Sequence, residues 1–225
     1  MIRLTHALLA GTIFALCAGS LAEAHTLKED AKREIVTQHD LSGFDAIDVS
    51  GVYLLDVRVG EAFSVTTEAT DRDTEWMKIE VEGDTLVLGM KEDRRRRYNE
   101  RETPGIRARV TLPRLTDLSI AGVASGSVVG IDGGDLNVDS AGVTDIEIKG
   151  RCDRLDMDMA GVGEIDAEGL QCRDVRAEVS GVGQLNVYAH DSVDAEIGGM
   201  GQIDVFGKPE NIRTEKSFFS DIDIR

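Results

Sequence analysis

The stretch that decides the fold is Leu155-Asp156-Met157-Asp158-Met159-Ala160-Gly161-Val162. Apolar and polar residues alternate along it up to Ala160-Gly161, and a second alternating run follows at Ile165 and Ala167. A period of two predicts a half-buried β-strand, and a glycine between two such runs predicts a sharp corner. A helix is excluded, because its apolar residues would recur every three to four positions.

The same pattern recurs along the C-terminal part of the chain. Its first apolar positions are Leu136, Leu155, Val175, Val193 and Ile212, which are 19, 20, 18 and 19 residues apart. A less regular copy lies at 118–123, and one early copy lies at 49–57. One coil cannot bury its apolar face alone, whereas coils stacked about 4.8 Å apart share a continuous core. We therefore expect an all-β protein whose regular coils of 18–20 residues, at about 118–225, form a β-solenoid preceded by irregular strands.

We have two further expectations, one for the backbone at the corners and one for the last coil. At each corner we expect glycine to supply a positive φ, while a small neighbour such as Ala160 leaves room for the next coil. The last coil has Ser217-Phe218-Phe219 where the others have their corner. These residues either plug the open end of the core or belong to a repeat that has drifted from the pattern.

The composition of the chain narrows the classes of partner. The 225 residues include 24 Gly, only 4% aromatic residues, and a formal net charge of −17. Such an acidic surface repels nucleic acid and anionic lipid headgroups, so neither is expected as a partner. No motif implies a cofactor.

The N-terminus has the features of a targeting segment. Arg3 precedes an apolar run at 8–16, and Ala22-Glu23-Ala24 is a small-x-small cleavage site. The run is too short to span a bilayer, and no second one follows. We expect a signal peptide at 1–24, a linker at 25–39, no transmembrane segment in the mature chain, and export to the periplasm or cell surface.

Two cysteines remain after removal of the signal peptide. Cys152 and Cys172 each lie three residues before the first apolar position of a coil, so stacking makes them neighbours about 5 Å apart. This separation suits a disulfide, which export would allow to form. The alternative is a pair of free thiols. Two cysteines without histidine at ligand spacing do not predict a zinc site.

The chain also resembles the head GIN domain family, whose members are described as auto-transporter adhesins. The residues that carry the resemblance are Phe44–Gly51, Gly60–Val65, Gly83–Leu88 and the recurring small-Gly-Val-Gly corners. The resemblance runs over 40–225 and implies one domain with a right-handed β-helix-like fold on an exported protein. It implies no catalytic residues.

Stacking would align acidic residues into columns on the outer surface. The first column is Asp139, Asp158, Glu178, Glu196 and Glu215; the second is Glu147, Asp166, Asn186, Asp204 and Asp223. Carboxylates at strand spacing repel one another unless cations, protons or water intervene. One interpretation is a weak site for Ca²⁺ or another hard cation, and the other is a solvated polar face.

The only basic cluster lies in a charged loop. It consists of Arg94, Arg95, Arg96, Arg97 and Arg101. One interpretation is a site that grips phosphate or an acidic glycan through bidentate contacts, and the other is a loop neutralised by its own acidic residues.

We expect a non-enzymatic, adhesin-like binding or scaffold module of the cell envelope, with an envelope glycan or protein as its partner. The alternatives are an enzyme acting on acidic polysaccharide and a cation-dependent binding module. Asp145, Glu164 and Asp221 share a further column that could supply a pair of catalytic carboxylates. Catalysis would need a cleft, however, and the coils have almost no loop insertions.

Overall fold

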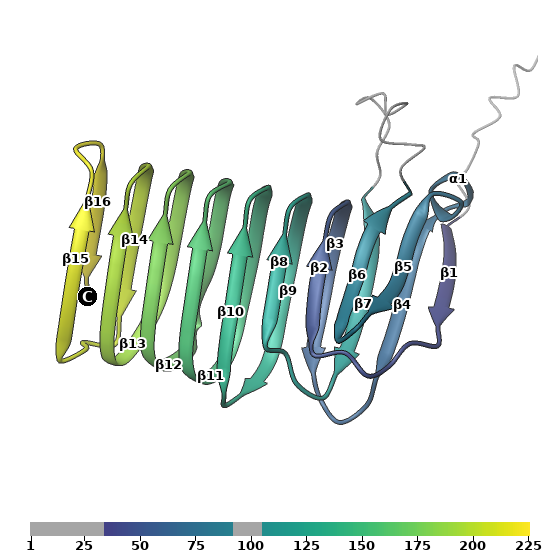
Figure 1. The fold of residues 1–225 in the computed structure, drawn as a ribbon, viewed down its shortest axis with the longest axis horizontal. Coiled ribbons are helices and arrows are strands. Elements are labelled where there is room, and N and C mark those ends of the chain that lie inside the picture. The colour runs from purple at the N-terminus through teal and green to yellow at the C-terminus, as the bar shows by residue number, and fades with distance from the viewer. Residues whose placement is uncertain (1–33, 92–104) are drawn as a thin grey trace, which may run out of the picture. The chain divides into compact units, whose positions relative to one another are not determined.

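The computed structural model describes residues 34–91 and 105–225, which form one β-solenoid (Figure 1). The predicted signal peptide and the basic loop lie outside the described residues. The described part contains sixteen strands and one helical turn. Their bounds are β1 Glu34–His39, β2 Ala46–Val49, β3 Val52–Val59, β4 Ser64–Thr70, α1 Asp71–Thr74, β5 Met77–Glu82, β6 Thr85–Met90, β7 Ile106–Leu112, β8 Asp117–Ile120, β9 Val123–Asp132, β10 Asp135–Ser140, β11 Val143–Met159, β12 Val162–Val179, β13 Val182–Ile197, β14 Met200–Phe206, β15 Asn211–Lys216 and β16 Ser220–Ile224.

Each regular coil consists of two strand segments joined at the glycine corner. The segment before the corner belongs to the first face, formed by β2, β6, β8, β10, β15 and the C-terminal parts of β11, β12 and β13. The segment after it belongs to the second face, formed by β3, β7, β9, β14, β16 and the N-terminal parts of the same long strands. Figure 1 shows the two faces as two rows of parallel arrows.

The predicted interior row of apolar residues is confirmed. Leu136 pairs with Leu155, Leu155 with Val175, Val175 with Val193, and Val193 with Ile212. The first four are at most 3% exposed. The all-β solenoid predicted from the repeat is therefore the fold of the protein.

The early copy of the coil motif is a regular coil. Val49 pairs with Ile120, and Val52 pairs with Val123, so β2 and β3 stack directly on β8 and β9. On their other side lie β6 and β7, which form one more coil although they follow β2 and β3 in sequence. The spatial order of the coils thus departs from the chain order at this end.

Antiparallel strands cover the N-terminal end of the stack. β5 pairs with β6, β4 pairs with β7, and β1 pairs with β4. Residues 34–39, which we expected to be in the linker, form β1, which pairs with β4 along its edge and has one half-buried side. These are the irregular strands expected before the regular coils.

The corner glycines are required because the backbones of successive coils approach closely there, and not because glycine can adopt a positive φ. None of Gly122, Gly142, Gly161, Gly181 and Gly199 has a positive φ, so our expectation on this point is wrong. A Cβ on any of the last four would instead overlap the carbonyl oxygen of the corner glycine in the preceding coil. Backbones of successive coils meet here without intervening side chains.

The last coil does not close the core with its phenylalanines. Phe218 is 93% exposed and Phe219 is 76% exposed, and the two rings contact each other edge to face. The plug interpretation is therefore wrong. Both rings project from the corner instead of covering the interior.

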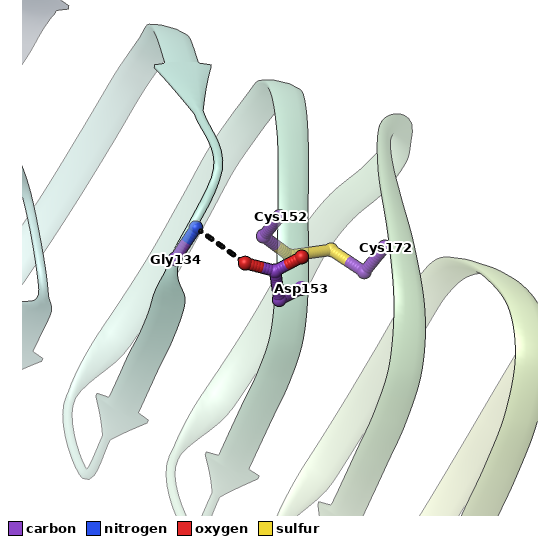
Figure 2. Close-up of a disulfide and its surroundings, with 4 residues drawn as sticks. All are labelled: Gly134, Cys152, Asp153 and Cys172. Carbon is purple, nitrogen blue, oxygen red and sulfur yellow. Dashed lines mark hydrogen bonds between the residues drawn. A yellow bond between two sulfur atoms is a disulfide. The ribbon is translucent and has the colours of Figure 1, made fainter.

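The predicted disulfide between Cys152 and Cys172 is present (Figure 2). Their Cα atoms are 4.5 Å apart because the two residues are register partners on β11 and β12. Beside it the Asp153 carboxylate accepts a hydrogen bond from the Gly134 backbone N–H at 3.1 Å. Three successive coils are thus linked at this corner.

Candidate functional site

The outward side chains of the two faces form continuous columns because the coils are in register. On the first face the predicted acidic column is present: each of Asp139, Asp158, Glu178, Glu196 and Glu215 is the register partner of the next. Asp139 also accepts a hydrogen bond from the Asn137 side-chain amide at 2.9 Å. The first face therefore carries a ladder of carboxylates at strand spacing.

Two arginines, which the sequence analysis overlooked, supply counter-charge to this ladder. Arg176 contacts Glu178 at 2.8 Å and reaches Asp156 on the preceding coil at 3.2 Å. Arg213 contacts Glu215 at 2.9 Å. Each arginine lies two residues before a ladder carboxylate, so strand alternation places both side chains on the same face. That spacing was the signal available in the sequence.

Asp158 lies between two other carboxylates of the ladder, Asp139 and Glu178. Partial burial raises the pKa of its carboxyl group, and the charges of Glu178 and Asp139 raise it further, while Arg176 opposes them.

Among the described residues no group of three or more His, Cys, Asp or Glu side chains is placed to hold a metal ion. Cation binding by this column stays a prediction.

The second acidic column is also in register on the second face, from Glu147 through Asp166, Asn186 and Asp204 to Asp223. Asp204 is only 4% exposed. Its carboxylate accepts a hydrogen bond from Gln202 at 3.0 Å and pairs with Arg225 at 3.0 Å. Since a buried carboxylate needs such partners, this end of the column has a structural role.

Carboxylates do not occupy every position of the column that was considered as a catalytic site. Asp145 and Glu164 are register partners, but Gln184 and Gln202 separate Glu164 from Asp221. Asp221 is paired with Lys216 at 2.7 Å. One adjacent carboxylate pair therefore lies on the open second face.

A row of exposed apolar side chains runs along the second face beside the glycine corners. We call it the valine ridge; its members are Val123, Val143, Val162, Val182, Met200 and Phe219. The first five are successive register partners and are 42–54% exposed. Phe219 follows Met200 in the stack, since the next residue, Ser220, pairs with Gly201. The outward direction of these residues was missed in the sequence, although unbroken alternation through the corner predicts it.

A shallow groove of about 730 Å³ follows the valine ridge. One wall contains Val143, Val182 and Met200, with Phe219 at the end. The other wall is polar and contains Asp145, Glu164, Gln184 and Gln202. The glycines Gly163, Gly183 and Gly201 lie between the two walls and also line the groove.

A second groove, of about 660 Å³, lies on the first face. Its charged lining includes Arg154, Arg176 and Arg213 together with Asp156 and Asp194. Arg176 and Arg213 also contact these aspartates, at 3.2 and 3.6 Å respectively. Positive and negative side chains thus alternate along this groove. The groove beside the valine ridge differs, because it has one apolar wall and one polar wall.

Three further expectations concern the basic loop, a membrane span and the disulfide. Arg94, Arg95, Arg96, Arg97 and Arg101 lie outside the described residues, so the anionic-ligand loop stays a prediction. No helix of the described residues is long and apolar enough to cross a membrane. The disulfide Cys152–Cys172 lies at the opposite corner of its coils from the valine ridge, between the second-face segment of each coil and the first-face segment of the next.

Two of the similar solved structures come from Bacteroides fragilis and Parabacteroides distasonis. A structure described as a "putative adhesin" from Bacteroides fragilis has 20% sequence identity and a TM-score of 0.68, and the match covers 87% of this chain and 98% of that one. Another "putative adhesin", from Parabacteroides distasonis, has 14% identity and a TM-score of 0.49 over 87% of this chain and 98% of that one. At these identities the first similarity shows the fold alone. No curated protein matches the chain.

The sequence also matches a family model across most of the solenoid. The match spans residues 43–209, which includes β2 to β14 and every complete regular coil up to the corner at Gly199. It starts at residue 43, directly before the motif at 44–51 that carried the resemblance noted in the sequence. The chain therefore belongs to the family described as "Putative auto-transporter adhesin, head GIN domain".

Proposed function

We propose that this protein is a non-enzymatic, exported binding module of the cell envelope that holds a glycan or protein partner on the faces of its solenoid. The observation that carries the proposal is the pair of long open grooves, one on each face, whose lining repeats from coil to coil. Repeated, in-register side chains suit an extended partner better than a small substrate, which is usually enclosed. Membership of an adhesin-like family agrees with this role.

Localisation is the first part to test. Expression of the full chain in a Gram-negative host, followed by fractionation and N-terminal sequencing, should place it in the periplasm or at the cell surface with His25 as its first residue. Recovery of unprocessed protein from the cytoplasm would contradict the proposal.

Binding is the second part. The exported, disulfide-bonded protein should bind a defined subset of an envelope glycan array or of purified envelope proteins. Binding should weaken when side chains lining either groove are changed. A screen in which neither glycans nor envelope proteins bind above the level of an unrelated acidic protein would contradict a binding role.

Catalysis is the competing outcome. Asp145 and Glu164 are the only neighbouring carboxylates in their column among the described residues. We expect no release of reducing ends from acidic polysaccharides. Turnover that is abolished by Asp145→Asn or Glu164→Gln, with the fold intact, would replace the binding proposal with an enzymatic one.

A further inference from the structure

We propose that the groove beside the valine ridge binds an amphipathic α-helix of a partner protein, with the apolar side of the helix on the ridge and its basic side toward Asp145 and Glu164. This inference deepens the binding role proposed above and rests on it. It concerns the second face only.

The exposure of the ridge is the first argument. Core residues of this solenoid are almost fully buried, whereas Val143, Val162 and Val182 are 45–52% exposed. The corresponding buried layer is complete without them, since Ile146, Ile165 and Leu185 on the same strand segments are 0–2% exposed. A contiguous apolar row of this kind, bordered by polar residues, is typical of a surface that contacts another molecule.

The spacing of the ridge favours a helix. Successive coils repeat about every 4.8 Å. Side chains on one side of an α-helix recur every three to four residues, which corresponds to a rise of about 5 Å, whereas alternate residues of an extended strand recur about every 6.6 Å. From Val123 to Phe219 the ridge has five such steps, or about 24 Å, so a helix of about 16 residues would cover it.

The charges beside the ridge set the chemistry of that helix. Asp145 and Glu164 line the groove. In the next column of the same face lie Asp166 and Glu147, and Glu147 is already paired with Lys149. The only basic side chain in contact with Asp145, Glu164 or Asp221 among the described residues is Lys216, which pairs with Asp221. Lysine or arginine along one side of the helix would meet this row of carboxylates, and acidic side chains there would be repelled.

A second copy of this chain is a poorer occupant. Each copy carries a formal net charge of −17, and a ridge-to-ridge contact would bring the same carboxylates toward each other. A glycan fits the ridge less well, because its only aromatic side chain is Phe219, at one end.

Two synthetic peptides test the inference on the full, disulfide-bonded chain. Both are 18-residue helices with leucines at i, i+3, i+4 and i+7; one has lysine at its polar positions and the other has glutamate. Fluorescence anisotropy measures their affinities. We expect the lysine peptide to bind at least tenfold more tightly than the glutamate peptide.

The ridge variant is Val143→Thr/Val162→Thr/Val182→Thr. Threonine keeps the β-branched shape and the preference for strands, so folding should be preserved, as circular dichroism and the melting temperature will show. We expect this variant to bind the lysine peptide at least tenfold more weakly. The single variant Val162→Thr should show a smaller loss in the same direction, and it provides the test if the triple variant does not fold.

A matched change on the first face separates a specific site from general attraction by an acidic protein. Asp139→Asn/Asp158→Asn/Glu178→Gln removes three carboxylates, whereas Asp145→Asn/Glu164→Gln removes two beside the ridge. The ridge-side pair should lower affinity several-fold, and the first-face triple should leave it within twofold.

Three outcomes would overturn the inference. They are equal binding by the threonine variant, an equal or larger loss from the first-face triple, and sedimentation showing that the ridge joins two copies of the chain. Envelope glycans or proteins that bind equally to the wild type and to the threonine variant would overturn the helix site while leaving the proposed function in place.

Discussion

The carbonyl oxygen of Gly181 occupies the space in which a Cβ of Gly199 would lie. Gly199 therefore has no room for any side chain, although its φ is not in the left-handed region. Its neighbour Gly198 has open space around the corresponding position. Comparing these two adjacent glycines distinguishes the steric requirement of close coil stacking from the effect of glycine on backbone flexibility.

We predict opposite effects of alanine at these two positions. Gly199→Ala should lower the free energy of unfolding by about 1–3 kcal/mol or more, as is usual for overpacking against a fixed neighbour. Gly198→Ala should be neutral or should stabilise by up to about 1 kcal/mol, because it reduces the entropy of the unfolded chain. Urea denaturation measures both. Equal effects would mean that the corner spacing is not the constraint.

The disulfide should contribute substantially to stability. It closes a loop with a sequence separation of 20 residues, for which the loss of unfolded-state entropy corresponds to about 3 kcal/mol. Both cysteines are buried, so Cys152→Ala/Cys172→Ala should lower the free energy of unfolding by about that amount without changing the fold. Dithiothreitol should destabilise the wild type comparably and leave the double variant unchanged. A double variant as stable as the oxidised protein would contradict this prediction.

Asp158 should make the protein less stable at neutral pH. Its carboxyl pKa in the folded state is raised above the ordinary value of 3.8, mainly by burial, so the folded state binds this proton more tightly than the unfolded state. The favourable contribution is complete below pH 3.8 and is lost as the pH rises through the raised pKa. Asp158→Asn should therefore increase the melting temperature at pH 7, and the difference should vanish in acid.

Asp221 is the matched control for this effect. The hydrogen bond from Lys216 lowers the pKa of its carboxyl group, so its contribution is present at neutral pH and is lost as the pH falls through the lowered pKa. Asp221→Asn should slightly decrease the melting temperature at pH 7. If both variants shift the melting temperature in the same direction, the electrostatic account of these two carboxylates is wrong.

Arg176 should stabilise the first-face ladder in a salt-dependent manner. Arg176→Gln leaves Asp156 and Glu178 without their shared cation, and we expect a loss of up to about 1 kcal/mol at low salt that shrinks at 1 M salt. Arg154→Gln is the control, since Arg154 makes no ion pair within the described residues. If calcium replaces the lost cation, it should raise the melting temperature of Arg176→Gln more than that of the wild type.

The repeat itself could be predicted from the sequence because it depends on local alternation. Once the coils are aligned at Leu136, Leu155 and Val175, the period places Cys152 beside Cys172 and Asp139 beside Asp158. These relationships need only the strand spacing. The same reasoning yields the carboxylate columns on both faces.

The order of the coils at the N-terminal end could not be predicted in this way. β2 and β3 lie between β6–β7 and β8–β9 in space, but nothing in the alternation of 46–49 indicates which strand will pair beside it. Strict alternation along each strand could have predicted that Arg176 and Arg213 lie on the same face as the acidic ladder. It could also have predicted that Val162 points outward. The ion pair between Arg225 and Asp204 could not be predicted, because it depends on the path of the chain after the last strand.

The in-register stacking of successive coils is tested most directly by engineered cysteines on the valine ridge. Val162 and Val182 are register partners on adjacent coils, whereas Val162 and Met200 are two coils apart. Non-reducing peptide mapping of oxidised Val162→Cys/Val182→Cys should find the new disulfide together with Cys152–Cys172, and Val162→Cys/Met200→Cys should show no intramolecular link. A link in the second variant and none in the first would contradict the stacking on which both grooves depend.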